Sequence, residues 1–574
     1  AAPAAAPAAA PATASTAATA AASAPATPDA APNAAQITAR GLLTAPILPT
    51  LMRLSIPNAV AMLATALVAI AETSYVGRLG IASLAGMALV FPMVMLQQMM
   101  SAGAMGGGVS SAISRALGAG DQARANALAV HAMMIGALAG AFFTVLFLVS
   151  GPRIYQLLGG RDATLAEALA YSNVVFIGAT GIWLTNTLAS VVRGSGNMKV
   201  PSVTLLAAAA IQVVVGAGLG LGLGPLPRLG MAGIALGQAV AFCSAAAFLY
   251  LFLRSRHARV KLSLGAAGVQ REMFFDILKV GAVACVSPLQ TVLTVLVLTR
   301  LISRFGTEAL AGYGIGARLE FLLVPITFAI GVACVPMVGM AIGAGDVRRA
   351  RRVAWAGGAV SAVIIGTIGA LVAIFPDLWA GLFTSDPAVL DATRSYLRLS
   401  GPCFGFLGLA LCLYFASQGS GKILGPVLGA TVRLAVVALG GWWLASRGEP
   451  AWTMFAMVGA SMVAYGCATA FAVRITRWGR CPGEPRAVPP TLRPTRRAGQ
   501  PSVAGRPVES CSAAGLARRQ AIRTVQRLVD PAADGRPLAR IQMQAELGAP
   551  PQHVVAGACP FLVDQVPKLG LEHA

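Results

Sequence analysis

The sequence predicts an all-α membrane protein with twelve transmembrane helices in two six-helix lobes, and three observations carry this prediction. The chain of 574 residues is 56% hydrophobic and 11% charged, whereas about 25% of the residues of a soluble domain are charged. It contains twelve long apolar runs, and its mean hydropathy is +0.73. Its halves also match, because the tetrapeptide Gly-Ala-Gly-Asp at residues 118–121 recurs 225 positions later at residues 343–346.

Further matches keep nearly the same interval. Gly-Ser-Gly at residues 194–196 recurs at 419–421, and Pro201 recurs as Pro426. At an interval of 226, Gly80, Leu84, Ala85 and Gly86 recur as Gly306, Leu310, Ala311 and Gly312. A duplicated bundle of about six spans is typical of transporters in which one half moves against the other around a central site.

The apolar runs are bounded by Gly, Pro or charged residues, and most reach the roughly 20 residues that a helix needs to cross the bilayer. The repeated Gly-Ala-Gly-Asp turns follow the second and eighth runs, and the repeated Gly-Ser-Gly turns follow the fourth and tenth. The first six runs cover residues 54–76, 84–113, 126–149, 169–192, 200–224 and 231–253. The other six cover 277–301, 310–342, 353–375, 396–416, 423–444 and 452–473.

This division predicts five segments. Residues 1–49 form an Ala/Pro-rich leader that is expected to be disordered, because its first forty residues are rich in Ala, Pro and Thr, almost uncharged and unable to bury a core. Residues 50–253 form the N-lobe with helices 1–6, residues 254–275 a cytoplasmic linker, and residues 276–476 the C-lobe with helices 7–12. Residues 477–574 form a basic Pro/Arg-rich cytoplasmic tail, which is also expected to be disordered.

The distribution of charge predicts topology, not nucleic-acid binding. The formal net charge is +22, but 15 of the 43 basic residues follow Val473 and most others lie in alternate loops. Because loops rich in Arg and Lys stay in the cytoplasm, we expect an inner-membrane protein with both termini cytoplasmic. Six spans per half give both lobes the same orientation, related by an axis along the membrane normal.

The chain lacks the patterns of an enzyme, a metal site or a cofactor site. Its nine cysteines form no CxxC pair and its four histidines are dispersed. Gly-Ser-Gly-Lys at residues 419–422 resembles the end of a phosphate-binding loop, but Ala416 stands at the first glycine position and Ile423 replaces the Ser or Thr that would bind magnesium. We therefore expect no enzyme and no ATP-driven pump.

Only two acidic residues, Glu72 and Glu320, fall inside apolar runs. A carboxylate there must face a polar cavity, find a partner or stay protonated, so each is a candidate coupling site. For Glu72 the alternative is a side chain that reaches the headgroups. For Glu320 it is packing or a hydrogen bond between helices, and Arg318 is no natural partner because residues i and i+2 on a helix face different ways.

The remaining candidates are a helix bend and a substrate cavity. Pro57 lies fifteen residues before Glu72 and either allows the first helix to bend or sits harmlessly in its first turn. The polar and Met-rich stretch around residues 97–100 suits varied apolar ligands, although Met in a membrane helix also serves packing. The residues that we assign to the substrate cavity are Gln97, Gln98, Met99, Met100, Gln212, Gln290 and Glu320.

Several motifs stand in a characteristic order: Pro57, the run Glu-Thr-Ser-Tyr-Val-Gly-Arg-Leu-Gly at residues 72–80, both Gly-Ala-Gly-Asp turns, and Arg-Gly-Ser-Gly at residues 193–196 followed by Pro201. Over about residues 50–476 the chain resembles the multidrug and toxic compound extrusion (MATE) family of bacterial secondary transporters. The resemblance implies a central cavity between the lobes. It also implies multidrug efflux, the export of small organic, often lipophilic or cationic compounds in exchange for protons or sodium ions.

The resemblance also implies roles for single residues. An Asp fifteen residues after the first-helix proline is the family's coupling acid in the N-terminal lobe, and Glu72 stands there. Many members have Asn and Asp where this chain has Gln212 and Gly216, and some have a Glu that aligns with Gln290. A C-lobe sodium site therefore lacks its carboxylates, which favours proton coupling through Glu72.

Three other functions remain as alternatives. A lipid-linked glycan flippase of the same broad superfamily would need a basic cavity for diphosphate, whereas the runs hold few cations. An integral-membrane enzyme would need clustered His, Asp or Ser in the runs, and a channel suits the duplicated bundle less well. The expected partners are the lipid bilayer and a small organic substrate, without nucleic acid, and we expect a monomer.

Overall fold

The computed structural model describes residues 41–262 and 269–479, and every regular element in this part is a helix. Eleven helical runs are long and apolar enough to cross a membrane, and a pair bent by 45° makes a twelfth. Each predicted apolar run overlaps one of them, and their ends differ by nine residues or fewer. The prediction of twelve membrane helices is confirmed.

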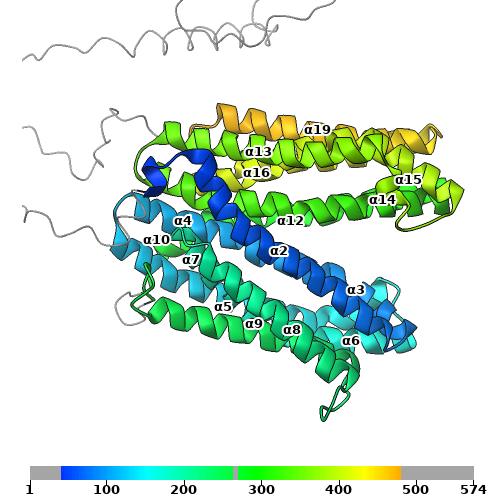
Figure 1. The fold of residues 1–574 in the computed structure, drawn as a ribbon, viewed down its shortest axis with the longest axis horizontal. Coiled ribbons are helices and arrows are strands. Elements are labelled where there is room, and N and C mark those ends of the chain that lie inside the picture. The colour runs from blue at the N-terminus through cyan, green and yellow to red at the C-terminus, as the bar shows by residue number, and fades with distance from the viewer. Residues whose placement is uncertain (1–40, 263–268, 480–574) are drawn as a thin grey trace, which may run out of the picture. The chain divides into compact units, whose positions relative to one another are not determined.

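The first half of the chain forms six spans (Figure 1). They are α2 (Ile47–Gly77); α3 (Ile81–Gln98), π-helix η1 (Met99–Met105) and α4 (Gly106–Gly118); α5 (Gln122–Leu157); α6 (Asp162–Ile177) with α7 (Ala179–Gly194); α8 (Lys199–Leu221); and α9 (Gly230–Arg254).

The second half repeats this order. Its elements are α10 (Arg271–Ala284), α11 (Val286–Ile302) and η2 (Ser303–Phe305); α12 (Thr307–Gly343); α13 (Val347–Ile374); the short α14 (Asp377–Ala380); α15 (Pro387–Ser400), η3 (Gly401–Cys403) and α16 (Phe404–Ser420); α17 (Leu424–Ala435), π-helix η4 (Val436–Gly440) and α18 (Gly441–Ser446); and α19 (Ala451–Ile475).

The duplicated Gly-Ala-Gly-Asp motif is a tight turn between two helices. Its second glycine, Gly120 or Gly345, has a φ of +80° or +81°, which suits glycine. Its aspartate then caps the next helix: Asp121 accepts a hydrogen bond from the backbone N–H of Arg124 at 2.8 Å, and Asp346 accepts one from Arg349 at 2.9 Å. The motif thus ends one span and starts the next in both halves.

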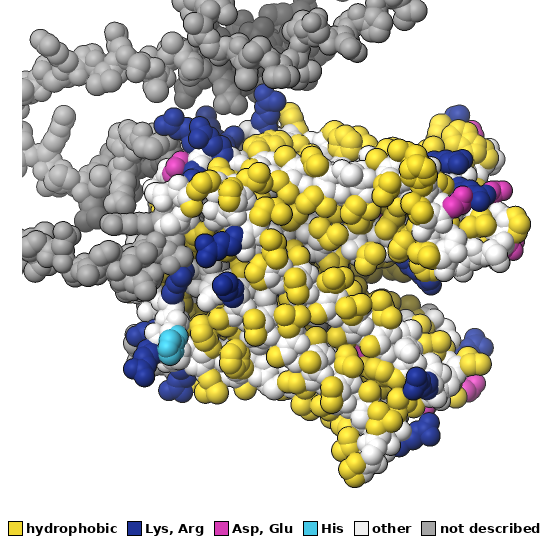
Figure 2. Space-filling model, viewed as in Figure 1, with side chains coloured by type: hydrophobic (Ala, Val, Ile, Leu, Met, Phe, Trp, Pro, Cys, Tyr) yellow, Lys and Arg dark blue, Asp and Glu magenta, His cyan; other side chains and the backbone are white. Residues whose placement is uncertain are grey.

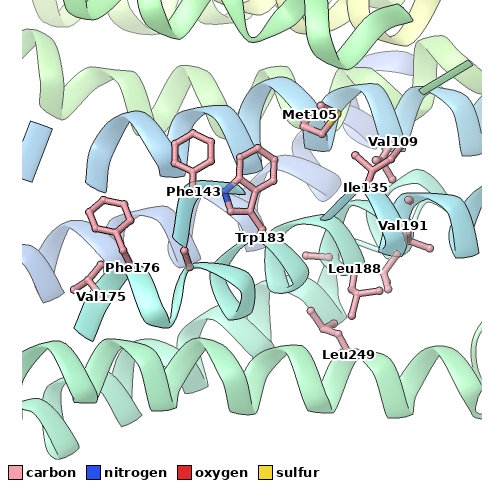
Figure 3. Packing of buried hydrophobic residues seen from close by; sticks show 14 of the residues in the cluster. Met105, Val109, Ile135, Phe143, Val175, Phe176, Trp183, Leu188, Val191 and Leu249 are labelled. Atoms are coloured by element: carbon pink, nitrogen blue, oxygen red, sulfur yellow. The ribbon is translucent and has the colours of Figure 1, made fainter. Parts of the chain in front are cut away.

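Each lobe has its own apolar core. In the N-lobe, shown in Figure 3, the Phe147 ring stacks on Phe176 with centroids 4.0 Å apart, and Trp183 packs beside Phe143. In the C-lobe, Tyr396 and Phe455 meet edge to face with centroids 5.7 Å apart. Between the cores, large apolar side chains lie exposed along the helices, and Figure 2 shows them covering the middle of the visible face. This surface suits contact with lipid.

The first span of each half packs against one lobe near its start and against the other lobe near its end. Leu51, near the start of α2, packs in a cluster with residues of α12, α13 and α16, whereas Tyr75 near its end belongs to the N-lobe core. In the same way, Ile277 of α10 belongs to the N-lobe core, whereas Leu298 of α11 belongs to the C-lobe core. Figure 1 shows α2 running obliquely between the two groups of helices.

The two ends of the bundle differ in charge and in closure. One end, here called the Arg-rich end, carries the turns between α4 and α5 and between α12 and α13, with Arg124, Arg348, Arg349 and Arg352. Here the lobes are tied together by an apolar cluster that joins Met198 of the N-lobe to Val335, Tyr414 and Ile423 of the C-lobe. At the opposite end, Figure 2 shows the surface hollowed between the two groups of helices.

The folded part begins before the expected boundary at residue 50. Residues 41–44 are helical, Leu42 is buried, and Arg349 donates hydrogen bonds from Nη2 to the backbone oxygens of Leu42 and Ala45. Likewise, Trp478 in the expected tail is 2% exposed. Residues 1–40 and 480–574, which hold the rest of the predicted leader and tail, lie outside the described residues.

Candidate coupling site in the N-lobe

Glu72 lies in the last two turns of α2, on the half of that helix that packs in the N-lobe. Its side chain is 6% exposed, so the alternative of a chain reaching out to the headgroups does not describe it. Gln212 on the neighbouring α8 donates a hydrogen bond from Nε2 to the Glu72 Oε1 atom at 2.7 Å. A hydrogen bond to a charged oxygen is among the stronger kinds, so Gln212 supports the carboxylate form.

Three more polar side chains complete what we call the Glu72 cluster: Tyr75, Tyr171 and Gln238, from α2, α6 and α9. All three are buried, and the Tyr171 hydroxyl donates to the Gln238 Oε1 atom at 3.4 Å. Tyr75 stands three residues after Glu72, on the same face of α2. The Tyr75 hydroxyl is buried without a hydrogen-bond partner.

Among the described residues, no basic side chain pairs with Glu72. A carboxylate in apolar surroundings costs free energy unless a cation or a proton neutralises it. The cluster can therefore bind either a proton or the positive group of a ligand, and binding of one disfavours binding of the other.

The packing of α8 on α9 leaves room beside this carboxyl. A Cβ atom on Gly237 of α9 would lie within 3.0 Å of the Gly216 backbone, so the two helices touch there. A Cβ on Gly216 itself would meet only ordinary contacts, at 3.5 Å from the Ile234 oxygen and 3.6 Å from the Tyr75 hydroxyl. Position 216 thus points toward the Glu72 cluster without contributing a polar group.

The predicted cavity residues Gln97, Gln98, Met99 and Met100 lie elsewhere in the N-lobe, where α3 passes into the π-helix η1. Gln97 is 0% exposed and neither atom of its amide has a partner. Gln98 accepts a hydrogen bond from Asn186 Nδ2 at 3.0 Å, and the same nitrogen donates to Ser101. Short π-helices inside spans are frequent at functional sites.

The other two predicted cavity residues lie in the C-lobe. Gln290 of α11 donates to the Thr431 hydroxyl of α17 at 2.7 Å, while its Oε1 atom is buried without a partner. Glu320 of α12 forms an ion pair with Arg433 of α17 at 2.8 Å, and their side chains are 18% and 11% exposed. Arg318 instead lies over the Phe383 ring, as expected for a residue that faces away from Glu320.

The two acids within the spans therefore differ in state. Glu320 has a permanent cation, and Glu72 has none among the described residues. Sequence reasoning singled out Gln212 by alignment and assigned it to the substrate cavity without pairing it with Glu72; it missed Tyr171, Gln238 and Asn186 and did not pair Glu320 with Arg433. One signal was present: Tyr171 and Tyr396 stand 225 positions apart, at the interval of the duplication.

Pro57 lies in the interior of α2, which excludes the alternative of a harmless first-turn proline. Within residues 41–262 and 269–479, no three His, Cys, Asp or Glu side chains converge as metal ligands would. A depression of about 500 Å³ between α5, α7 and α9 is lined mainly by apolar residues such as Leu184 and Ala246, and it contains none of the predicted site residues.

Twelve spans in two repeated lobes, with an unpaired acid buried in one of them, define a membrane transporter. Comparison with known proteins identifies the kind: the sequence pattern of the family described as MatE matches residues 57–217 and 284–443. The chain therefore belongs to the MATE family of membrane transporters, which are not enzymes.

The chain is similar to several characterised relatives. It is 24% identical over 399 residues to the FAD transporter of Shewanella oneidensis, covering 70% of this chain and 88% of that one. It is 24% identical to the probable multidrug resistance protein NorM of Thermotoga maritima over 66% of this chain and 81% of that one. For the multidrug export protein MepA of Staphylococcus aureus the identity is 25%, over 68% and 87%.

Solved structures share the fold. A transporter of the MOP superfamily from Pyrococcus furiosus, described as having a binding pocket of reverse polarity, aligns with a TM-score of 0.70 and 21% identity over 75% of this chain and 96% of that one. A MATE transporter described as outward-facing aligns with a TM-score of 0.68 and 22% identity over 76% and 96%. Two lobes of six helices are thus the family's architecture.

Proposed function

We propose that this protein exports small organic compounds, lipophilic or cationic ones in particular, from the cytoplasm in exchange for protons. The observation that carries the proposal is Glu72: a buried carboxyl on a span, held by Gln212 and without a basic partner among the described residues. The names of the relatives support export of drug-like molecules. Protons are favoured over sodium ions because Gly216 and Gln290 stand where the resembling family has carboxylates.

The orientation that we propose puts the Arg-rich end in the cytoplasm of a cell with this protein in its inner membrane. Figure 2 supports it, since Lys and Arg outnumber Asp and Glu at one end, whereas both signs of charge are mixed at the other. The hollow at the opposite end then opens outward, and we expect the chain to act as a monomer.

The exchange follows from competition at one carboxyl. A charged Glu72 attracts a cationic substrate, and a proton that arrives from outside removes that attraction, so the substrate leaves. Because α2 packs on the C-lobe at one end and on the N-lobe at the other, a change at Glu72 acts on a helix that belongs to both lobes. Pro57 lies between the two parts, where the missing hydrogen bond eases a bend.

One ion pair argues against the flippase alternative. A lipid-linked diphosphate needs free cations, but Arg433, a partly buried arginine within a span, is already neutralised by Glu320. Gln290 of the C-lobe and the N-lobe residues Gln97 to Met100 are proposed to contact substrate at successive stages of its passage.

Everted membrane vesicles test the proposal. In a sodium-free buffer with a preformed pH gradient, addition of ethidium or tetraphenylphosphonium is expected to dissipate the gradient in vesicles that contain the protein, and not in vesicles without it. A strict requirement for sodium ions would contradict proton coupling.

A further inference from the structure

The first glycine of each Gly-Ala-Gly-Asp motif is not needed for the turn, since only the second glycine has positive φ. Gly118 ends α4 of the N-lobe and Gly343 ends α12 of the C-lobe. A Cβ atom on Gly118 would overlap the backbone of Met340, and a Cβ on Gly343 would overlap the backbone of Arg115. Both glycines therefore lie where the two lobes touch.

The residues on the two sides of this contact are related by the internal duplication. Met340 and Arg115 stand 225 positions apart, like Gly118 and Gly343, so each lobe presents the same surface to the other. Between these two contacts, Ser114 meets Gly339, again 225 positions away, and a Cβ on Gly339 would overlap the Ser114 hydroxyl. We call these three contacts the axis contact. They are approximately self-complementary, as expected around a two-fold axis.

Polar bonds reinforce the axis contact. The Ser111 hydroxyl of α4 donates to the backbone oxygen of Gln418 on α16, and the Gln418 amide donates back to the Gly103 oxygen at 3.2 Å. Beside them, Asp276 at the start of the seventh span accepts from Arg115 at 3.1 Å and from Arg124 at 2.9 Å. All of these groups lie toward the Arg-rich end, where the lobes are closed.

We propose that Gly118 and Gly343 are positioning residues for transport: as a reciprocal pair, they allow the two lobes to close the cytoplasmic side of the pathway. Backbone meets backbone there, so even a methyl group separates the lobes. The state that is closed at this end would be penalised, and the state that is open to the cytoplasm would gain population. The side on which access changes rests on the orientation proposed above.

Cysteine labelling tests this without knowledge of the substrate or the coupling ion. In a chain whose native cysteines are replaced, Met198→Cys places a thiol in the buried cluster between the lobes, where Met198 is 3% exposed. Gly118→Ala and Gly343→Ala are each expected to speed labelling by a membrane-impermeant maleimide from the cytoplasmic side by about tenfold. Export should fall while the inserted amount stays normal.

Gly314→Ala is the matched control. Gly314 lies in the same helix as Gly343, and a Cβ there would have nothing within 4 Å. Since Gly→Ala normally favours a helix, this variant should label and transport like the parent. Faster labelling and lower export in Gly343→Ala but not in Gly314→Ala would therefore be due to the contact between the lobes. Ser111→Ala removes the bonds from this hydroxyl to the backbone oxygens of Gln418 and Gly419, together with the bond that it accepts from Arg115. It provides a milder second variant that should speed labelling in the same direction.

Unchanged labelling in inserted Gly118→Ala and Gly343→Ala proteins would overturn the proposal. Faster labelling from the periplasmic side alone would overturn the assignment of the contact to the cytoplasmic side. Neither result depends on the vesicle test of proton coupling, so each of the two proposals can be refuted without the other.

Discussion

The two acids within the spans, Glu72 and Glu320, show how neighbours decide what a carboxyl can do. Arg433 neutralises Glu320 across two spans, so that acid is best suited to joining α12 to α17. Glu72 accepts a hydrogen bond from the Gln212 amide instead, and this bond supports a charge without cancelling it. Only the second arrangement leaves a charge free for exchange between a proton and a substrate.

Gly216 gives a prediction at the same scale. Because a Cβ at 216 meets only ordinary contacts near the Tyr75 hydroxyl, Gly216→Asp should place a second carboxylate beside Glu72. Two adjacent carboxylates cannot both stay charged without a cation. We expect export by this variant to become stimulated by sodium ions, and Gly216→Asn, of the same size without the charge, to show no such stimulation. Ethidium efflux with and without sodium measures it, and equal response of both variants would contradict the geometry.

At the scale of elements, the Glu320–Arg433 pair is predicted to be structural. Arg433→Leu leaves a carboxylate without a partner between α12 and α17, a change that typically costs about 3–5 kcal/mol at a buried pair. Thermal unfolding in detergent should show a lower melting temperature. Adding Glu320→Gln should recover most of the loss, because no unpaired charge remains; a double variant as unstable as the single one would argue against the pair.

The elements also show what the sequence could predict. Length and apolarity were sufficient for all twelve spans, and the duplicated turns placed their ends, because both depend on local composition. The crossing of α2 and α10 between lobes was not predictable, since no local pattern records which neighbour a helix meets. For the same reason Gln212 was found through alignment, while the contacts of Tyr171 and Arg433, whose partners lie 67 and 113 positions away, were missed.

At the scale of the whole molecule, both ends of the described chain help to hold the Arg-rich end together. Trp478 packs in the same cluster as Leu42 and Val473. A chain ended after Thr476 loses this indole and should be less stable by about 1–3 kcal/mol than a chain ended after Gly479. Melting curves of the two truncated proteins provide the comparison. Equal stability would show that the boundary of the C-lobe lies before Trp478, as the sequence had suggested.

The whole-molecule account has one central claim, that Glu72 exchanges its proton for substrate while the lobes alternate. Ethidium export driven by an imposed pH gradient, in vesicles with equal amounts of inserted protein, tests it most directly. Glu72→Gln keeps the size and the hydrogen-bonding capacity but removes the charge, so active export should be lost by about a hundredfold or more if coupling requires ionisation. Glu72→Asp, which keeps the charge with a shorter reach, should retain part of it. Proton-driven export by Glu72→Gln at the rate of the parent protein would contradict the account.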